Sequence, residues 1–193
     1  MNAFLPAVEN VVFYDMETTG LDPFQNRIIS IQVRSRGKTT IWKEWQLGEI
    51  ECVESFFDYL STLKKRETSL VGYNVLKFDV SFLDQRLRLL QRMNNWKWRT
   101  LHKWTHWIDL YQFLGDAYCK ASFWYSSMLG VRQSVVNADI PRLYAERSAD
   151  SLQVILDYVE EEMRNMELVY EQIKSESFYK ELVELRRKLV DEN

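Results

Sequence analysis

Two carboxylates stand one residue apart at the end of an apolar run, VVFYDMETTG, at residues 11–20. The run is typical of a buried strand, and residues two apart in a strand point to the same side. Asp15 and Glu17 are therefore aimed at one spot, where like charges repel unless something positive lies between them. Because carboxylate oxygens suit hard cations, the pair predicts half of a Mg²⁺ or Mn²⁺ site.

Further acidic residues are available to complete such a site. Asp79 lies between a Gly/Asn-containing loop and a segment of helical period, so it can reach a neighbouring strand end. A long helix expected over 151–174 supplies others, including Asp157, Glu160, Glu161 and Glu162. Tyr158 and Glu162 are four residues apart and share one helical face. A buried tyrosine beside solvated glutamates is the alternative interpretation of that helix.

The elements that must position these groups follow from hydrophobic periodicity. Three strands are expected at residues 10–16, 27–36 and 38–45, pairing as a meander across a turn at Arg36-Gly37. A helix over 52–66, a short strand over 69–74 and a helix over 79–93 come next. This succession of strands and interleaved helices predicts a mixed α/β domain.

The second half of the chain is expected to be mainly helical. Residues 94–109 are aromatic and basic and give no clear assignment. Short helices are predicted at 110–118 and 122–131, and a Pro141-containing loop at 137–150. The long helix at 151–174 is followed by a C-terminal amphipathic helix at about 175–193.

Composition limits the class of protein. A chain of 193 residues with 46% hydrophobic and 27% charged residues suits one globular domain, taken as 1–193. Its apolar runs are too short for a membrane span and its N-terminus lacks the pattern of a signal peptide, so a soluble, cytoplasmic protein is expected. With a net charge of −3, nucleic acid would be held by local basic groups or metal ions rather than by the overall field.

Three motifs in order resemble those of the DEDD, or DnaQ-like, 3′-5′ exonucleases, which have an RNase H-like fold. The first, D-x-E-T-T-G, matches residues 15–21, and the second, N-x3-F-D-x3-L, matches residues 74–83. The third, Y-x3-D in the tyrosine subgroup, corresponds to YVEEE, where Glu162 stands at the place of the aspartate. Glu161 is a competing ligand at this motif and Asp157 a weaker one.

The resemblance implies a mixed β-sheet flanked by α-helices and a two-metal-ion nuclease. Two Mg²⁺ or Mn²⁺ ions would activate the attacking water and stabilise the leaving 3′ oxygen, so that nucleoside 5′-monophosphates are released. Asp15, Glu17, Asp79 and Glu162 would be the catalytic metal ligands. Tyr158 would orient the water, since a phenol with a pKa near 10 positions better than it accepts protons.

The same resemblance implies a set of substrate-binding residues after the first and within the second motif. These are Met16, Thr18, Thr19, Gly20, Leu21, Asn74, Phe78 and Phe82. Leu21 would lie beside the last base. For Phe82, ordinary core packing is an equally good interpretation.

Single-stranded DNA is the expected substrate, as in the small stand-alone archaeal exonucleases that this chain resembles. The segment NNWKWRTLHKWTHW, residues 94–107, interleaves tryptophans with Lys97, Arg99 and Lys103, which suits stacking on unpaired bases. Tryptophan and arginine are also enriched at subunit interfaces, and a homo-oligomer, possibly a trimer, is the expected assembly. The alternatives are a 3′-5′ exoribonuclease and a nucleic-acid-binding module weakened by the aspartate-to-glutamate change.

Overall fold

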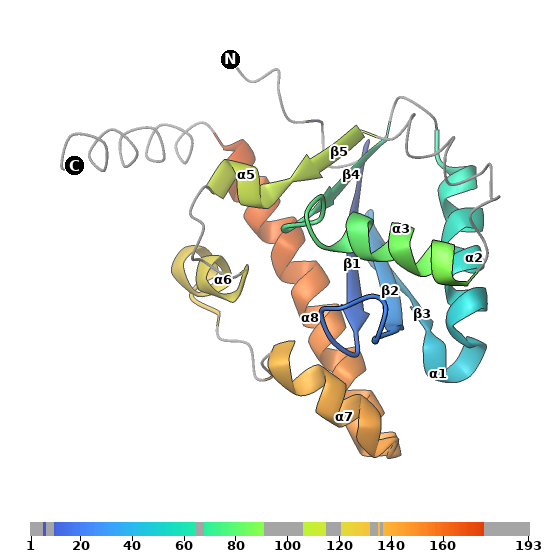
Figure 1. Ribbon diagram of the computed structural model, residues 1–193. Helices are drawn as coiled ribbons and strands as arrows, with labels where there is room; N and C mark the ends of the chain where they lie inside the picture. Colours follow the sequence, from blue (N-terminus) through green and yellow to red (C-terminus); the bar gives the residue numbers. More distant parts are fainter. Residues whose placement is uncertain are drawn as a thin grey trace, which may run out of the picture.

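A mixed sheet of five strands runs through the centre of the protein in the order β3-β2-β1-β4-β5 (Figure 1). The computed structural model describes residues 6, 10–64, 68–90, 106–114, 121–131, 135 and 137–175. The strands are β1 (Val11–Thr18), β2 (Ile28–Ser35), β3 (Lys38–Lys43), β4 (Ser69–Gly72) and β5 (His106–Asp109). β2 is antiparallel to both β1 and β3, whereas β1–β4 and β4–β5 are parallel pairs.

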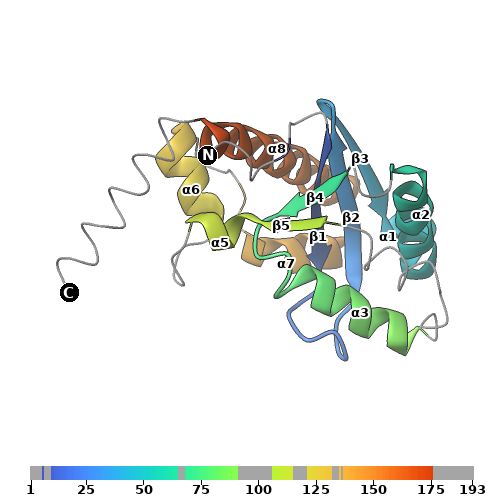
Figure 2. The ribbon, with the colours of Figure 1, turned by 90° about the horizontal axis from the view of Figure 1, so that it is seen from above.

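Helices cover both faces of this sheet, and Figure 2 shows α2 and α8 on its opposite sides. One face carries α2 (Glu49–Thr62) and α3 (Asp79–Leu89), and the short α1 (Glu44–Leu47) leads into α2 while its Trp45 packs with the other layer. The other carries α5 (Leu110–Leu114), α6 (Ala121–Leu129), the 3₁₀ turn η2 (Asn137–Asp139), α7 (Ile140–Glu146) and α8 (Ala149–Lys174). The predicted mixed sheet flanked by helices is therefore confirmed.

Strand alternation divides the core into two layers. Val11 and Phe13 of β1 pack with the buried residues of α6, α7 and α8. Val12 and Tyr14, one residue out of phase, pack with the buried residues of α2 and α3. Because β1 lies in the middle of the sheet and is covered on both sides, the polar groups on it are largely shielded from water.

The predicted strand meander and most helices are confirmed with small shifts at their ends. Arg36 and Gly37 have φ values of 51° and 74°, the left-handed conformations that a tight hairpin turn requires. β1 extends to Thr18, so both Asp15 and Glu17 belong to the strand. β3 ends at Lys43, because the next four residues form α1.

The loop predicted over 137–150 is wrong. This segment contains η2, α7 and the beginning of α8, where the Ser148 side chain accepts a hydrogen bond from the Ser151 amide. Pro141 suggested a break, but it lies in the first turn of α7, where a missing N–H breaks no helical hydrogen bond. In the unassigned aromatic segment, His106–Asp109 forms β5.

Several expectations lie outside the described residues. The C-terminal amphipathic helix and residues 91–105, which include most of the tryptophan-rich segment, are among them. Within the part of the chain that is described, no helix combines the length and apolar character that crossing a membrane would require.

The packing of α8 against the sheet should contribute much of the protein's free energy of unfolding. Ile155 is fully buried on the sheet-facing side of this helix. Ile155→Ala should lower the free energy of unfolding by about 2–5 kcal/mol through lost burial and the cavity it leaves. Leu168→Ala on the same helix is the matched control, because Leu168 is 41% exposed. Urea denaturation followed by circular dichroism measures both, and equal effects would contradict this packing.

Candidate active site

Three carboxylates from two distant parts of the chain meet on one face of the sheet. Oxygens of Asp15, Glu17 and Glu162 all lie within 4.8 Å of one another. Asp15 and Glu17 continue the series of β1 residues that faces α8, and Glu162 comes from α8 itself. The register between β1 and β2 shifts after Glu17, so the regular strand pairing ends where the carboxylates lie.

Asp79 lies beside this group as the first residue of α3 and is 4% exposed. Burial raises the pKa of its carboxyl well above the usual value, and the charges of Asp15 and Glu162 raise it further. Within the described residues, Asp79 Oδ1 and Glu162 Oε2 are buried without a hydrogen-bond partner. Buried acceptors of this kind are costly unless a proton or cation satisfies them. This donor set fits a hard divalent cation.

The cluster carries more negative charge than a buried site tolerates without compensation. Burial raises the pKa of Glu17 well above its usual value, with Asp15, Glu162 and Asp79 adding to the effect. Burial likewise raises the pKa of Glu162 to about 8, and the Asp15 charge is the next cause. Without a cation the cluster therefore retains protons near neutral pH, and a bound cation would replace them.

Gln32 on β2 fixes the orientation of Asp15, which the sequence interpretation missed. The two residues are paired across the strands, and Gln32 Nε2 donates to Asp15 Oδ2 at 2.6 Å. Ser30 Oγ in turn donates to Gln32 Oε1 at 3.0 Å, and both side chains are fully buried. The signal in the sequence was the polar alternation of Ser30 and Gln32 in an otherwise apolar strand.

Tyr158, one helical turn before Glu162, is buried with its hydroxyl held in place. The hydroxyl donates to Asn137 Oδ1 at 3.0 Å. Burial first, and then the Glu162 charge, raises the pKa of Tyr158 far above its usual value, so the phenol stays protonated. Asn137 was missed because it lies in the segment that was interpreted as a loop, and nothing in its local sequence indicates a tyrosine partner.

Asp109, at the end of β5, shapes the loop that leads to Asp79. Its carboxylate accepts hydrogen bonds from the amides of Asn74 at 2.7 Å, Leu76 at 3.2 Å and Tyr111 at 3.1 Å. Asn74 has the left-handed φ of 57° at this point. An aspartate directly after a short apolar strand was the signal that could have identified Asp109.

The residues expected to contact substrate after the first motif build a defined turn. Thr18 Oγ1 donates to the Gly20 carbonyl at 2.8 Å, and Thr19 Oγ1 accepts from the Arg27 amide at 3.0 Å. A Cβ on Gly20 would lie 2.6 Å from Asn26 Oδ1, so a side chain here would displace the Asn26 amide from its hydrogen bonds to Thr19 and Asp22. Leu21 projects from the turn and is 82% exposed.

Two expected substrate-binding side chains are instead part of the core. Met16 and Phe82 are 4% and 2% exposed and pack in the layer with α2 and α3. Met16 points away from the carboxylates because it alternates with Asp15 and Glu17 on β1. Phe82 packs against the partly buried Phe78, with ring centroids 5.6 Å apart. Neither Met16 nor Phe82 offers side-chain surface to a substrate.

The competing acidic residues of α8 occupy other positions. Asp157 is exposed and accepts a hydrogen bond from Gln153 Nε2 at 2.8 Å. Glu161 is partly exposed and is not one of the three residues whose oxygens lie within 4.8 Å of one another. The structure therefore brings Glu162, rather than its neighbours, to the β1 carboxylates.

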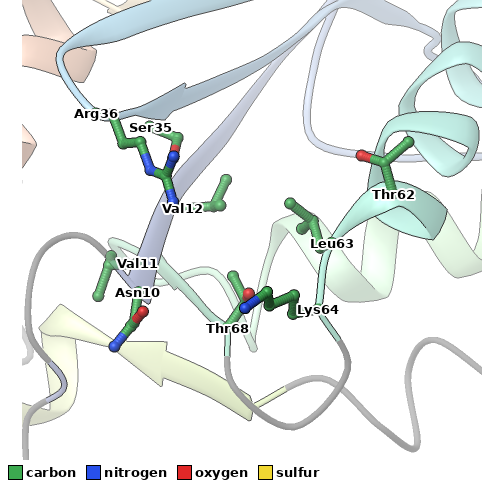
Figure 3. Close-up of a pocket in the computed structure, with 9 residues that line it drawn as sticks. All are labelled: Asn10, Val11, Val12, Ser35, Arg36, Thr62, Leu63, Lys64 and Thr68. Carbon is green, nitrogen blue, oxygen red and sulfur yellow. The ribbon is translucent and has the colours of Figure 1, made fainter.

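A separate cavity of about 290 Å³ lies at the other end of β1 (Figure 3). It is lined by residues including Asn10, Val12, Arg36 and Lys64. These residues are near the beginning of β1, whereas Asp15 and Glu17 are near its end. The cavity therefore does not belong to the carboxylate site.

The raised pKa of Glu162 predicts how stability depends on pH. The folded protein binds this proton more tightly than the unfolded chain, whose glutamate has the usual pKa of 4.5. The resulting stabilisation is complete below that value and is lost as pH rises toward about 8. In EDTA, the Tm should therefore fall by at least about 4 °C between pH 5 and pH 8.

Calorimetry with and without Mn²⁺ checks this dependence. Mn²⁺ should raise the Tm more at pH 8 than at pH 5, because the ion binds the deprotonated carboxylates. Glu162→Gln has no proton to lose at this position and should flatten the slope of Tm against pH. A slope unchanged by Glu162→Gln would contradict the buried, proton-binding state of this residue.

Comparison with known proteins agrees with this architecture. The model of a family named RNase_H_2, described as RNase_H superfamily, matches residues 12–174. No curated protein matches the chain. The family B DNA polymerase from the hyperthermophilic archaeon Pyrobaculum calidifontis is structurally similar, with 13% identity and a TM-score of 0.68 over 84% of this chain. The match spans 24% of the polymerase chain, and at this identity it concerns the fold alone. The chain belongs to the RNase_H_2 family and has an RNase H-like fold.

Proposed function

We propose that this protein is a metal-dependent 3′-5′ exonuclease that removes nucleoside 5′-monophosphates from the 3′ end of single-stranded DNA. The observation that carries the proposal is that carboxylate oxygens of Asp15, Glu17 and Glu162 lie within 4.8 Å of one another in a largely buried site. These carboxylates come from the two segments that resemble the first and third exonuclease motifs. The polarity of attack and the preference for DNA are supported by that resemblance.

Asp15, Glu17, Asp79 and Glu162 would hold two Mg²⁺ or Mn²⁺ ions. Such ions would lower the pKa of the attacking water and would stabilise the negative charge of the leaving 3′ oxygen. The protein's own part is to hold its ligands in fixed orientations. Gln32 does this for Asp15, since the hydrogen bond between them leaves the carboxylate one defined position on β1.

Tyr158 would position the attacking water rather than take its proton. The phenol stays protonated near neutral pH, because burial and the charge of Glu162 oppose its ionisation. Its hydroxyl donates to Asn137 and lies beside the Glu162 carboxylate, and its lone pairs can accept a hydrogen bond from a water next to that carboxylate. A water that donates to Tyr158 would thereby have one of its lone pairs oriented toward a phosphate.

The replacement of the motif's aspartate by Glu162 is compatible with a working site. Glu162 is the acidic residue of α8 whose oxygen reaches Asp15 and Glu17, and it is 6% exposed. Burying a carboxylate beside like charges is unfavourable, so in an inactive protein the Glu162 side chain would not be expected to stay in this cluster. This placement favours catalysis over a binding module that has lost activity.

Activity should depend on the cluster and not on the charge of α8 in general. Asp15→Asn and Glu162→Gln should each lower the rate at least about 100-fold, because each removes a charge that would hold a cation at the scissile phosphate. Asp157→Asn, an exposed neighbour on α8, should retain the wild-type rate. The measurement is a gel time course on 5′-labelled single-stranded DNA with Mg²⁺ or Mn²⁺.

The same time course tests the competing interpretations. RNA of the same sequence, run in parallel, identifies an exoribonuclease if it alone is shortened. Glu162→Asp should be slower than the wild type, because the shorter side chain falls a methylene short of the β1 carboxylates. If the wild type shortens neither strand and Glu162→Asp begins to cut, the catalytic proposal is overturned.

A homo-oligomer, possibly a trimer, remains part of the proposal. It is supported by the resemblance to small archaeal exonucleases and by the tryptophan-rich segment. Sedimentation equilibrium of the full chain would give the subunit number directly.

A further inference from the structure

A partly buried ion pair joins α2 to α3 outside the carboxylate cluster. Arg86 Nη2 lies 2.6 Å from Glu49 Oε2, and Arg86 Nε donates to Glu49 Oε1 at 2.7 Å. The two side chains are only 13% and 10% exposed. Paired, bidentate contacts of this kind fix the geometry of both partners more tightly than a single contact does. We call this pair the α2–α3 brace.

The remaining hydrogen bonds of the brace go to the β1–β2 loop, residues 19–27, and to the first residue of β2. Arg86 Nη1 donates to the Pro23 carbonyl at 2.9 Å, in the middle of the loop. Glu49 Oε1 also accepts from the amide of Ile28 at 2.9 Å, where the loop enters β2. Both members of the brace therefore hold the loop, and Figures 1 and 2 show the loop beside α3.

The loop itself is ordered and yet exposes large apolar side chains. Asp22 caps it: its carboxylate accepts from the Phe24 amide at 2.9 Å and its carbonyl from the Asn26 amide at 2.8 Å. Leu21 and Phe24 are 82% and 69% exposed, the highest values among the large hydrophobic residues that the structure describes. An ordered loop that presents such side chains to water offers a surface for binding.

The position of the loop indicates what that surface binds. It begins directly after β1, so Leu21 is only a few residues from the carboxylate of Glu17. A phosphodiester bond at the cluster would bring the adjacent bases to this loop. Aromatic and apolar faces bind unpaired bases by stacking, whatever the base sequence.

We propose that the brace holds the β1–β2 loop so that Phe24 stacks on an unpaired base at the end of the substrate, beside the Leu21 that the exonuclease resemblance already assigns to the last base. Arg86 and Glu49 are then positioning residues for substrate binding, and they act through the loop rather than by contact. This inference rests on the proposed function, because it takes a single-stranded nucleic acid as the ligand. It assigns Arg86 to the loop rather than to direct contact with phosphates.

The chain provides a matched control for Arg86. Arg88 lies on the same helix and has the same charge, but it is 60% exposed and pairs with Asp84 within α3. Arg88→Met therefore removes the same charge without touching the loop. Glu49→Gln changes the charge in the opposite sense, so it separates positioning from simple attraction of phosphates.

The experiment measures binding of a 5′-fluorescent single-stranded DNA oligonucleotide by anisotropy, with Ca²⁺ in place of Mg²⁺. Arg86→Met, Glu49→Gln and Phe24→Ala should each raise the Kd about 10-fold, the loss expected for one stacked base. Arg88→Met should bind like the wild type. The double variant Arg86→Met/Phe24→Ala should also be about 10-fold weaker, not about 100-fold, because both changes remove the same contact.

Several results would overturn the inference. One is a multiplied effect in the double variant, which would mean that Arg86 acts independently of Phe24. Another is tighter binding by Glu49→Gln, which would show that the charges act on phosphates directly. The inference would also be overturned if Arg86→Met had an unchanged Tm and bound the oligonucleotide like the wild type. Should Arg86→Met not fold, Phe24→Ala with an oligonucleotide lacking its two terminal bases replaces it, and the two changes should again not add.

The experiment gives different results if the proposed function itself is wrong. If the wild type neither binds nor shortens the oligonucleotide with any divalent ion, both the function and the inference are rejected. If the wild type shortens the oligonucleotide while the brace variants bind like the wild type, only the inference is rejected.

Discussion

Repulsion among buried carboxylates is the constraint around which this protein is organised. Asp15, Glu17 and Glu162 lie within 4.8 Å of one another in a site largely shielded from water, and Asp79 adds its charge. Each group resists ionisation there, because burial favours the protonated form. For Glu17, Asp79 and Glu162 the neighbouring carboxylates add to this effect. The rest of the fold must hold these groups together against that repulsion, and a divalent cation is what would turn the repulsion into attraction.

The sheet and α8 supply this restraint from two directions. β1 lies at the centre of the sheet, between β2 and β4, so its alternation fixes Asp15 and Glu17 on the α8 face. α8 is held to the same face by a continuous apolar stripe and by the ion pair of Arg34 with Glu167 at 2.5 Å. The carboxylates can approach because the surrounding apolar packing is extensive enough to outweigh their repulsion.

Sequence patterns within single strands and helices made part of the carboxylate site predictable. The D-x-E spacing, the start of a helix at Asp79 and the shared face of Tyr158 and Glu162 are short-range properties of one strand or helix. Met16 was assigned to the substrate by motif, although strand alternation turns it into the core. Gln32 and Asn137 acquire their partners only through β-sheet pairing and through the packing of η2 on α8. Single-segment patterns contain no information about such long-range contacts, and Pro141 further obscured α7.

The two halves of α3 connect the carboxylate cluster to the β1–β2 loop. Its first residue, Asp79, faces the other carboxylates, and Arg86, two turns later, holds Pro23 and Glu49. A helix is stiff over this length, so the distance between the carboxylate and the guanidinium is fixed by the backbone. β1 joins the same two sites a second time, since the loop follows Glu17 directly. Two rigid elements thus set the spacing between the carboxylate cluster and the exposed Leu21 and Phe24. The proposed exonuclease would need such a fixed spacing to cut at one distance from a stacked end.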